Sequence, residues 1–143
     1  MKCVNFNEFK CEKKTSKIKK NKVCAEKIFS DAYYASDIKE KIKLYTIGIK
    51  LNPYFIDAYF NRAELYKKLK KYNKAIDDYK RAAIEFTKAI HEDPNDSEAY
   101  QNRAFAYYNL KRYSPSIKDY SNAIKLTPEN KNIYLNRGTY IIK

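Results

Sequence analysis

A five-residue pattern occurs three times along the 143 residues: Tyr, any residue, Asn, Arg and a small residue. The copies begin at Tyr59, Tyr100 and Tyr134, so the first two are 41 residues apart and the last two are 34 apart. Residues further along repeat as well: residues 71–79 resemble residues 112–120, at an offset of 41. Internal periods of 20–50 residues are the signature of stacked repeats, in which each unit buries its apolar face against the next. This constrains the fold more than any other feature of the sequence.

Each copy predicts a pair of helices. Apolar residues recur at steps of three and four, as in Tyr113, Ile117 and Tyr120, with charged residues between them. Because proline is disfavoured within a helix, the second helix of each pair is expected to end near one of Pro53, Pro94 and Pro128. In the last pair we expect Ser114 to be the N-cap and Pro115 to lie in the first turn.

This pattern resembles the tetratricopeptide repeat, a 34-residue helix–turn–helix unit with aromatic, small and proline residues at fixed spacing. The similarity is fullest over residues 100–128 and covers about residues 22–143. It implies an all-α fold, a right-handed α-solenoid of antiparallel helix pairs, with about three repeats and a partial one. The expected units are 22–53, 54–94, 95–128 and the partial 129–143, preceded by a basic, flexible tail over 1–21. Two departures are Ser116, where alanine is preferred, and a degenerate first helix in the first unit.

The offset changes from 41 to 34 between Tyr79 and Phe86, inside the second helix of the middle unit. Seven extra residues are close to two helical turns and rotate a helix face by only ~20°. We therefore predict one continuous helix over 73–91, with an apolar stripe formed by Ala75, Ile76, Tyr79, Ala82, Phe86, Ala89 and Ile90. The extension is either a neutral duplication or an additional docking surface.

Composition excludes several classes of protein. Two glycines and four prolines are too few for the turns of an all-β fold, and no apolar run approaches the length of a membrane span. The N-terminal residues lack the apolar stretch of a secretory signal, and we expect an intracellular, cytoplasmic protein. Cys3, Cys11 and Cys24 contain no CxxC pair and His91 is the only histidine, so neither a metal site nor a nucleophilic pair is indicated. We expect no enzyme activity and no cofactor.

The resemblance implies that the first helices of successive units line a concave peptide-binding groove. Asn61, Asn102 and Asn136 take equivalent places in three first helices, and an amide presents donors and an acceptor that match the backbone of an extended peptide. This is similar to the asparagine ladder in the repeats of the O-linked N-acetylglucosamine transferase. An alternative is that Asn-Arg is simply common at this position of the family. The predicted groove residues are Asn61, Asn102, Asn136, Phe60, Glu64, Lys68, Gln101, Phe105 and Tyr108.

The expected function is a scaffold or adaptor that binds an extended segment of another protein, and three alternatives remain. A formal net charge of +13 suggests RNA binding through a lysine surface, although lysines outnumber arginines 25 to 5. A co-chaperone-type carboxylate clamp is implied by the family, but Glu26, Ser30, Phe60, Glu64, Asn132 and Asn136 stand where it needs other residues, lysine and arginine above all. Self-association through the incomplete last repeat is the third alternative.

Overall fold

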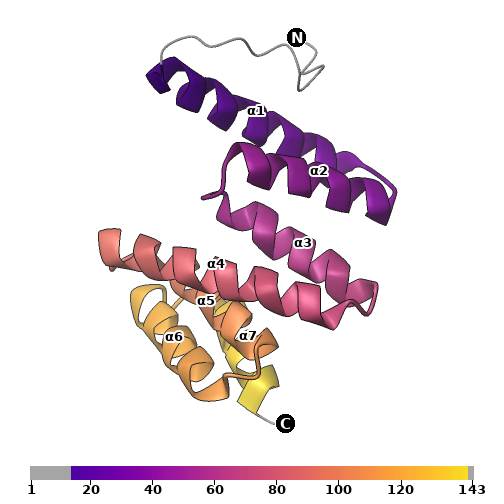
Figure 1. Cartoon of the computed structure of the whole chain (residues 1–143). Coiled ribbons are helices and arrows are strands. Elements are labelled where there is room, and N and C mark those ends of the chain that lie inside the picture. Colours follow the sequence, from indigo (N-terminus) through magenta and orange to yellow (C-terminus); the bar gives the residue numbers. More distant parts are fainter. Residues whose placement is uncertain (1–13, 142–143) are drawn as a thin grey trace. The chain divides into compact units, whose positions relative to one another are not determined.

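The computed structural model describes residues 14–141, and these form seven α-helices with no strand among them (Figure 1). Short turns connect the helices, which confirms the all-α fold of helix pairs predicted from the repeats. The helices are α1 (Lys14–Tyr34), α2 (Ile38–Leu51), α3 (Ile56–Lys68), α4 (Tyr72–Glu92), α5 (Ser97–Asn109), α6 (Tyr113–Leu126) and α7 (Lys131–Ile141).

The sequence expectation of a tail over 1–21 lies in part outside the described residues, which begin at Lys14 with the first turn of α1. Cys3 and Cys11 also lie outside them, and Cys24 is a partly buried thiol on α1. None of the helices in the described part of the chain has the length and apolar character needed to cross a membrane.

The chain divides within α3 into two compact units, one up to Ala58 and one from Tyr59 onward. In the first unit α1 packs against α2. The ring of Phe29 lies 5.5 Å from that of Tyr45 and 4.7 Å from that of Phe55. A Cβ atom built on Gly48 would lie 3.8 Å from the backbone oxygen of Ala25, so a small residue suits this helix contact.

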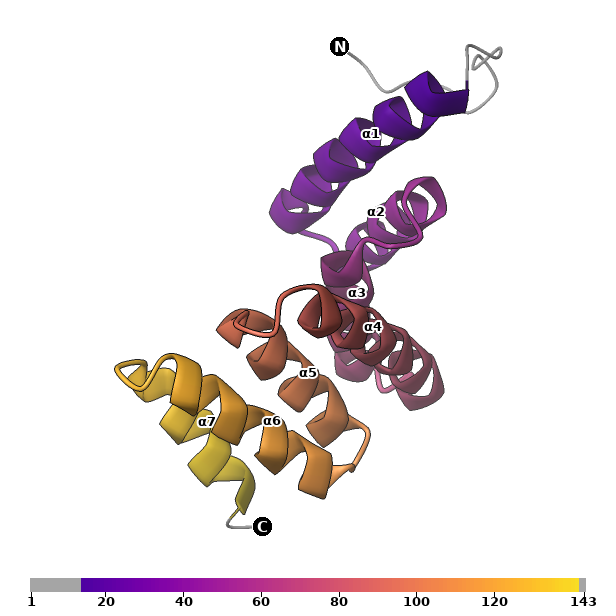
Figure 2. The ribbon, with the colours of Figure 1, turned by 90° about the vertical axis from the view of Figure 1, so that its left-hand side faces the viewer.

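The second unit contains the rest of α3 and the helices α4 to α7 (Figure 2). One core cluster joins α3, α4 and α5, and a second joins α5, α6 and α7. Alanines lie where the helices cross, while Tyr79 and Tyr120 are the largest fully buried side chains in their clusters. The buried members of the two clusters are Ala63, Ala75, Tyr79, Ala83 and Ala106, and Ala104, Tyr120, Ala123 and Ile133.

The prolines mark helix ends as predicted. Helices α2, α4 and α6 each end two residues before Pro53, Pro94 or Pro128. Beside the first two prolines a side-chain oxygen closes the turn, since Asn52 Oδ1 accepts a hydrogen bond from the Tyr54 N–H at 3.1 Å and Asp93 Oδ1 accepts one from the Asn95 N–H at 3.0 Å. Each side-chain oxygen thus pairs an N–H of the loop that leads into the next helix.

The turn inside each complete helix pair of the second unit has the same backbone geometry. Lys70 and Lys111, 41 residues apart, have φ values of 57° and 58°, in the left-handed region that favours glycine. The next residue then donates its N–H five residues back, from Arg112 to the Tyr107 carbonyl at 2.8 Å. This turn starts α6 at Tyr113, earlier than expected. The prediction that Ser114 is the N-cap is therefore wrong: Arg112 is the N-cap and makes no side-chain capping bond, whereas Pro115 does lie in the first turn.

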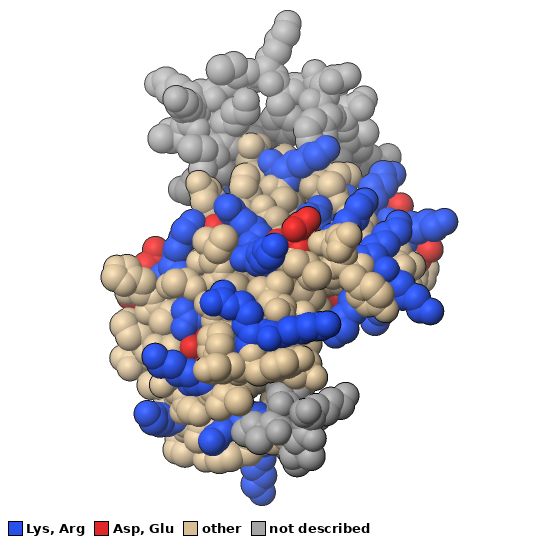
Figure 3. Space-filling model, turned by 60° about the horizontal axis from the view of Figure 1, so that its bottom comes forward, with Lys and Arg blue, Asp and Glu red and all other residues tan. Residues whose placement is uncertain are grey.

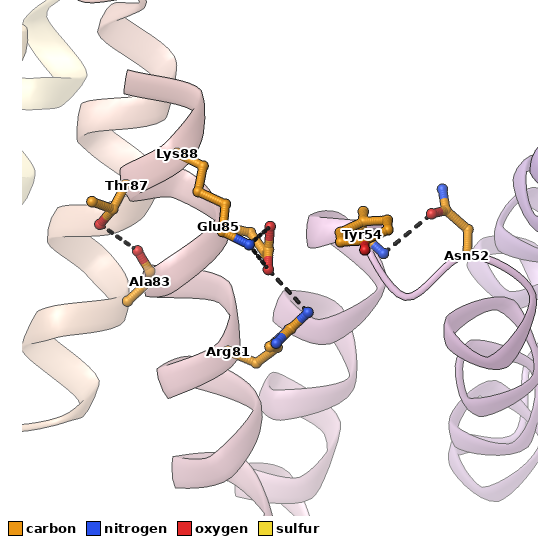
Figure 4. A network of polar contacts seen from close by, with 7 residues as sticks. All are labelled: Asn52, Tyr54, Arg81, Ala83, Glu85, Thr87 and Lys88. Carbon is orange, nitrogen blue, oxygen red and sulfur yellow. Dashed lines mark hydrogen bonds and ion pairs between the residues drawn. The ribbon is translucent and has the colours of Figure 1, made fainter. Parts of the chain in front are cut away.

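Helix α4 runs unbroken over Tyr72–Glu92, which confirms the long helix predicted over 73–91. Most of the predicted stripe is buried, and Ala83 belongs to it as well. Glu85 is also buried, and it accepts hydrogen bonds from Lys88 Nζ at 3.0 and 3.1 Å and pairs with Arg81 at 3.0 Å (Figure 4). The extension thus holds a buried carboxylate between two cations of its own helix.

An arginine–aspartate pair links the two helices of each complete pair in the second unit. Arg62 Nε and Nη2 donate to Asp78 Oδ2 and Oδ1, both at 2.8 Å. Arg103 Nε and Nη2 donate to Asp119 Oδ2 and Oδ1 at 2.7 and 2.8 Å. Both aspartates are buried, and both pairs join residues sixteen apart. Such bidentate geometry fixes orientation as well as distance.

Each arginine also lies between two tyrosines of its own helix. The Arg62 guanidinium is 5.9 and 5.7 Å from the rings of Tyr59 and Tyr66, and Arg103 stands in the same relation to Tyr100 and Tyr107 at 5.7 and 5.8 Å. The hydrogen bond to Asp119 raises the pKa of Arg103 above its ordinary value despite partial burial, so the guanidinium stays charged.

Removing one member of a buried pair should destabilise the fold strongly. We expect Asp119→Ala to lower the free energy of unfolding by about 3–5 kcal/mol, because it leaves a partly buried guanidinium without its counter-charge. Urea unfolding followed by circular dichroism measures this. The double variant Arg103→Met/Asp119→Leu should recover most of the loss, and a single-variant loss below about 1 kcal/mol would show that the pair does not hold the helices together.

Two substitutions near the seven-residue extension test which side of α4 is buried there. Phe86 is 6% exposed and Ile84 is 52% exposed, although they are only two residues apart. We expect Phe86→Ala to cost about 3–5 kcal/mol of unfolding free energy, because it leaves a cavity. Ile84→Ala, the matched control, should cost about 0.5 kcal/mol or less, as surface substitutions do. Equal losses would mean that the buried stripe is not aligned as described.

Candidate functional site

The first helices of two complete repeats, α3 and α5, contact each other, in part through two of the predicted groove residues. The rings of Phe60 and Phe105 lie 5.2 Å apart. One turn or more further along, Lys67 Nζ donates to Asn109 Oδ1 at 2.7 Å and lies 6.0 Å from the Phe105 ring centre. We call Phe60, Lys67, Phe105 and Asn109 the α3–α5 face. It combines partly buried aromatic surface with one cation and one amide.

The three asparagines of the predicted ladder lie on α3, α5 and α7, one on each first helix of the second unit. Asn61 and Asn102 are partly buried and Asn136 is exposed. Each directly precedes an arginine, and in α3 and α5 that arginine pairs with the second helix. The repeated Arg–Asp pair therefore gives Asn61 and Asn102 the same position relative to their own helix pair.

Glu64 makes its hydrogen bond within its own repeat. Its carboxylate accepts a hydrogen bond from the hydroxyl of Tyr79 on α4. Burial, then this hydrogen bond and the nearby negative charge, raise the pKa of Tyr79 well above its ordinary value, so the hydroxyl stays a donor. The Tyr79 ring also meets Phe60 edge-on, at 6.1 Å between centroids. Through Tyr79, helix α4 supports the aromatic part of the α3–α5 face.

The remaining predicted groove residues lie on the same helices with different neighbours. Gln101 Nε2 donates to the Ser97 hydroxyl at 3.4 Å, one turn back on α5. The ring of Tyr108 lies 5.7 Å from that of Tyr113 at the start of α6. Lys68 is exposed at the last residue of α3. The structure thus brings Phe60 and Phe105 into direct contact, and places Gln101 and Tyr108 beside residues outside the predicted set.

Four residues that orient this site were not predicted from the sequence. Arg62, Asp78, Arg103 and Asp119 repeat at an offset of 41 and were visible in the alignment of the units. Arg103 makes a further bond, from Nη1 to the Thr87 hydroxyl of α4 at 3.1 Å. This bond ties the second complete pair to the helix that precedes it.

Three lysines line a surface hollow at the turn between α3 and α4. Lys70, Lys71 and Lys74, together with Tyr72 and Asn73, line this shallow hollow of about 280 Å³. The Lys74 ammonium also lies 5.6 Å from the Tyr66 ring centre. Lys70 and Lys71 belong to the turn and Lys74 to the first helical turn of α4, so none of the three is part of the α3–α5 face.

The helix pairs observed in the structure are similar to repeats of known proteins. Residues 56–83 and 97–130 match the family model of the tetratricopeptide repeat, while curated protein sequences give no match. The tetratricopeptide domain of Arabidopsis OM64 is 26% identical with a TM-score of 0.55, over 84% of this chain and 96% of that one. The first such domain of Spaghetti (RPAP3), solved with the HSP90 peptide SRMEEVD, is 26% identical with a TM-score of 0.50, over 87% of this chain and 90% of that one.

The fold alone is shared with MamA from Desulfovibrio magneticus RS-1. That protein is 19% identical with a TM-score of 0.57, and the match covers 87% of this chain and 67% of that one. The repeated helix pairs, the two matched segments and the solved domains lead to one assignment. Residues 56–83 and 97–130 are tetratricopeptide repeats, and the chain shares the fold of solved tetratricopeptide domains.

Proposed function

We propose that this chain is a protein-interaction scaffold that binds an extended peptide segment across α3, α5 and α7. The observation that carries the proposal is the α3–α5 face, where Phe60 of one repeat meets Phe105 of the next at 5.2 Å. The two rings form an apolar surface that spans two successive repeats. A peptide side chain placed on it gains burial without moving the helices, because the rings are already packed against the core.

The ladder supplies the polar part of the proposed binding mode. Asn102 and Asn136 lie at equivalent places on α5 and α7, with Asn61 at that place on α3. An amide side chain offers both a donor and an acceptor, so each can pair with one N–H and one C=O of an extended backbone. Backbone pairing of this kind is independent of peptide sequence, and selectivity then comes from the aromatic residues.

A structural neighbour that was solved with its ligand supports a peptide as the molecule that this chain binds. The Spaghetti (RPAP3) domain was solved with a seven-residue peptide, and the match covers 87% of the present chain. This supports peptide binding as the shared activity of the fold. The acidic character of that peptide is not carried over, because Glu64 and Asn136 stand at positions where a carboxylate clamp needs other groups.

The charge distribution gives less support to RNA binding. Figure 3 shows lysines and arginines spread over the visible surface, with acidic side chains between them, rather than gathered into one track. On the α3–α5 face Lys67 is already hydrogen-bonded to Asn109. A phosphate backbone would need several free cations in a row, and its affinity would fall steeply with salt.

The ladder is tested with linear peptides selected from a displayed library against the wild-type chain. We expect Asn61→Ala/Asn102→Ala/Asn136→Ala to raise Kd by about a hundredfold or more, since at least one hydrogen bond is lost at each asparagine and each bond is worth roughly 1 kcal/mol. Fluorescence anisotropy measures the affinity. Asn73→Ala, an exposed asparagine at the start of α4, is the matched control and should leave Kd unchanged. An unchanged Kd in the triple variant would remove the ladder from the binding mode.

The clamp alternative is tested with the peptide SRMEEVD itself. We expect its free-carboxylate form and its C-terminal amide to bind with Kd values within about a factor of three, since the three asparagines of the ladder carry no charge to pair with the terminal carboxylate. Titrating both forms at low and moderate salt separates local recognition from the general effect of a basic chain. A tenfold or larger preference for the carboxylate at both salt concentrations would replace the ladder with a clamp.

A further inference from the structure

Two dipeptides of the sequence place a hydroxyl residue directly before proline, Ser114-Pro115 and Thr127-Pro128. Serine or threonine followed by proline is the motif that proline-directed protein kinases phosphorylate. The two copies lie at opposite ends of α6, since Ser114 is the second residue of the helix and Thr127 follows its last residue. The motif itself does not distinguish them as substrates, but their surroundings in the fold do.

The hydroxyl of Ser114 is exposed and makes no hydrogen bond with the residues that the structure describes. The N-cap of α6 is Arg112, which makes no side-chain capping bond either. Pro115 has no N–H, so the backbone bond that closes this turn runs from the Ser116 N–H to the Arg112 carbonyl at 3.2 Å. Proline also disfavours helical backbone at the residue before it. The first turn of α6 therefore opens more readily than a capped one, and opening exposes Ser114 in the extended conformation that a kinase binds.

The hydroxyl of Thr127, in contrast, connects two helices. Its oxygen lies 2.7 Å from the Ser97 hydroxyl oxygen, on the first residue of α5, and 3.1 Å from the Ala123 carbonyl oxygen. Thr127 is also partly buried. A kinase can reach this hydroxyl only after these contacts between α5 and α6 are broken. The same dipeptide is therefore accessible at one end of α6 and protected at the other.

The charges around Ser114 suit a phosphate group. Residues 99–118 contain no aspartate or glutamate. The turn before the serine carries Lys111 and Arg112, and both are exposed. Lys118 is exposed as well, and it follows Ser114 by four residues, so the two side chains share one face of α6. A phosphate on Ser114 gains charge-assisted contacts with these cations.

We propose that Ser114 is phosphorylated by a proline-directed serine/threonine kinase, and that Lys118 and the cations of the preceding turn bind the phosphate. The Ser114 hydroxyl oxygen forms a bond to the terminal phosphorus of a nucleoside triphosphate. The bond between that phosphorus and the nucleoside diphosphate breaks, and the hydroxyl proton passes to a base of the kinase. The modification replaces a neutral group by one that carries about −1.5 to −2 charges at neutral pH. It does not depend on the proposed peptide face.

The site is tested by phosphorylating the folded full chain and locating the phosphate by mass spectrometry. The kinase is one that phosphorylates two synthetic peptides, residues 109–119 and 122–132, at similar rates, so that both motifs are substrates when unfolded. In the folded chain we expect Ser114 to be phosphorylated at least about tenfold faster than Thr127, because only the first turn of α6 opens without breaking side-chain contacts. Ser114→Ala and Pro115→Ala should each remove this fast phosphorylation.

Binding of the phosphate by the neighbouring cations is tested by the stability of the phosphorylated chain. We expect phosphorylation to raise the midpoint of thermal unfolding, followed by circular dichroism, by about 2–4 °C. In Lys118→Ala the rise should be at most about half as large, since one of the cations is lost. This variant changes an exposed side chain, so the unphosphorylated form should retain the helical spectrum of the wild type.

Three results would overturn the proposal. The first is a folded chain in which Ser114 receives no phosphate while the 109–119 peptide does. The second is phosphorylation of Thr127 in the folded chain as fast as that of Ser114, because the fold would then not select between the two motifs. The third is a thermal midpoint that stays the same or falls on phosphorylation, which would show that the cations do not bind the phosphate.

Discussion

The register of the helix pairs in the second unit depends on a bidentate bond between an arginine and an aspartate sixteen residues apart. Arg62 and Arg103 each contribute two donors in a plane, and the buried carboxylates of Asp78 and Asp119 accept one bond on each oxygen. Alanines at the crossings allow close approach but specify little, because a small side chain packs in many ways. The charged pair supplies the specificity that an alanine-lined core lacks.

Much of the fold could be predicted because repetition reports on packing directly. Pro53, Pro94 and Pro128 set helix ends through the chemistry of a single residue, and the two offsets located the lengthening of α4. The start of α6 could not be predicted from the Ser-Pro pair. The start of α6 is set by the left-handed backbone conformation of Lys111, and the sequence has no glycine at that position to indicate such a turn. Each Arg–Asp pair joins residues of two different helices, on either side of the turn between them, so the periodicity within one helix does not reveal the pair.

In the candidate site, alignment of the repeats predicts the helix face on which a residue lies, but it does not predict the partner that its side chain contacts. Phe60 and Phe105 were placed on one face and do meet. Glu64 was placed on that face too, yet it bonds to Tyr79 of the same repeat. Its equivalent in the next unit is Phe105, so there was no second carboxylate from which to infer the contact. Residues that differ between units depend on local neighbours, and those are known only from the structure.

The length of α4 has a consequence for how such a chain can change. Insertions and deletions are usually confined to loops, because one extra residue inside a helix turns everything beyond it by about 100°. Seven residues return the helix to within about 20° of its starting orientation, and eleven do nearly the same in the opposite sense. A repeat of this kind can therefore grow from within a helix as long as it grows in those steps. In such arrays, a change of period by seven is a change in reach that leaves the orientation of each unit's contacts intact.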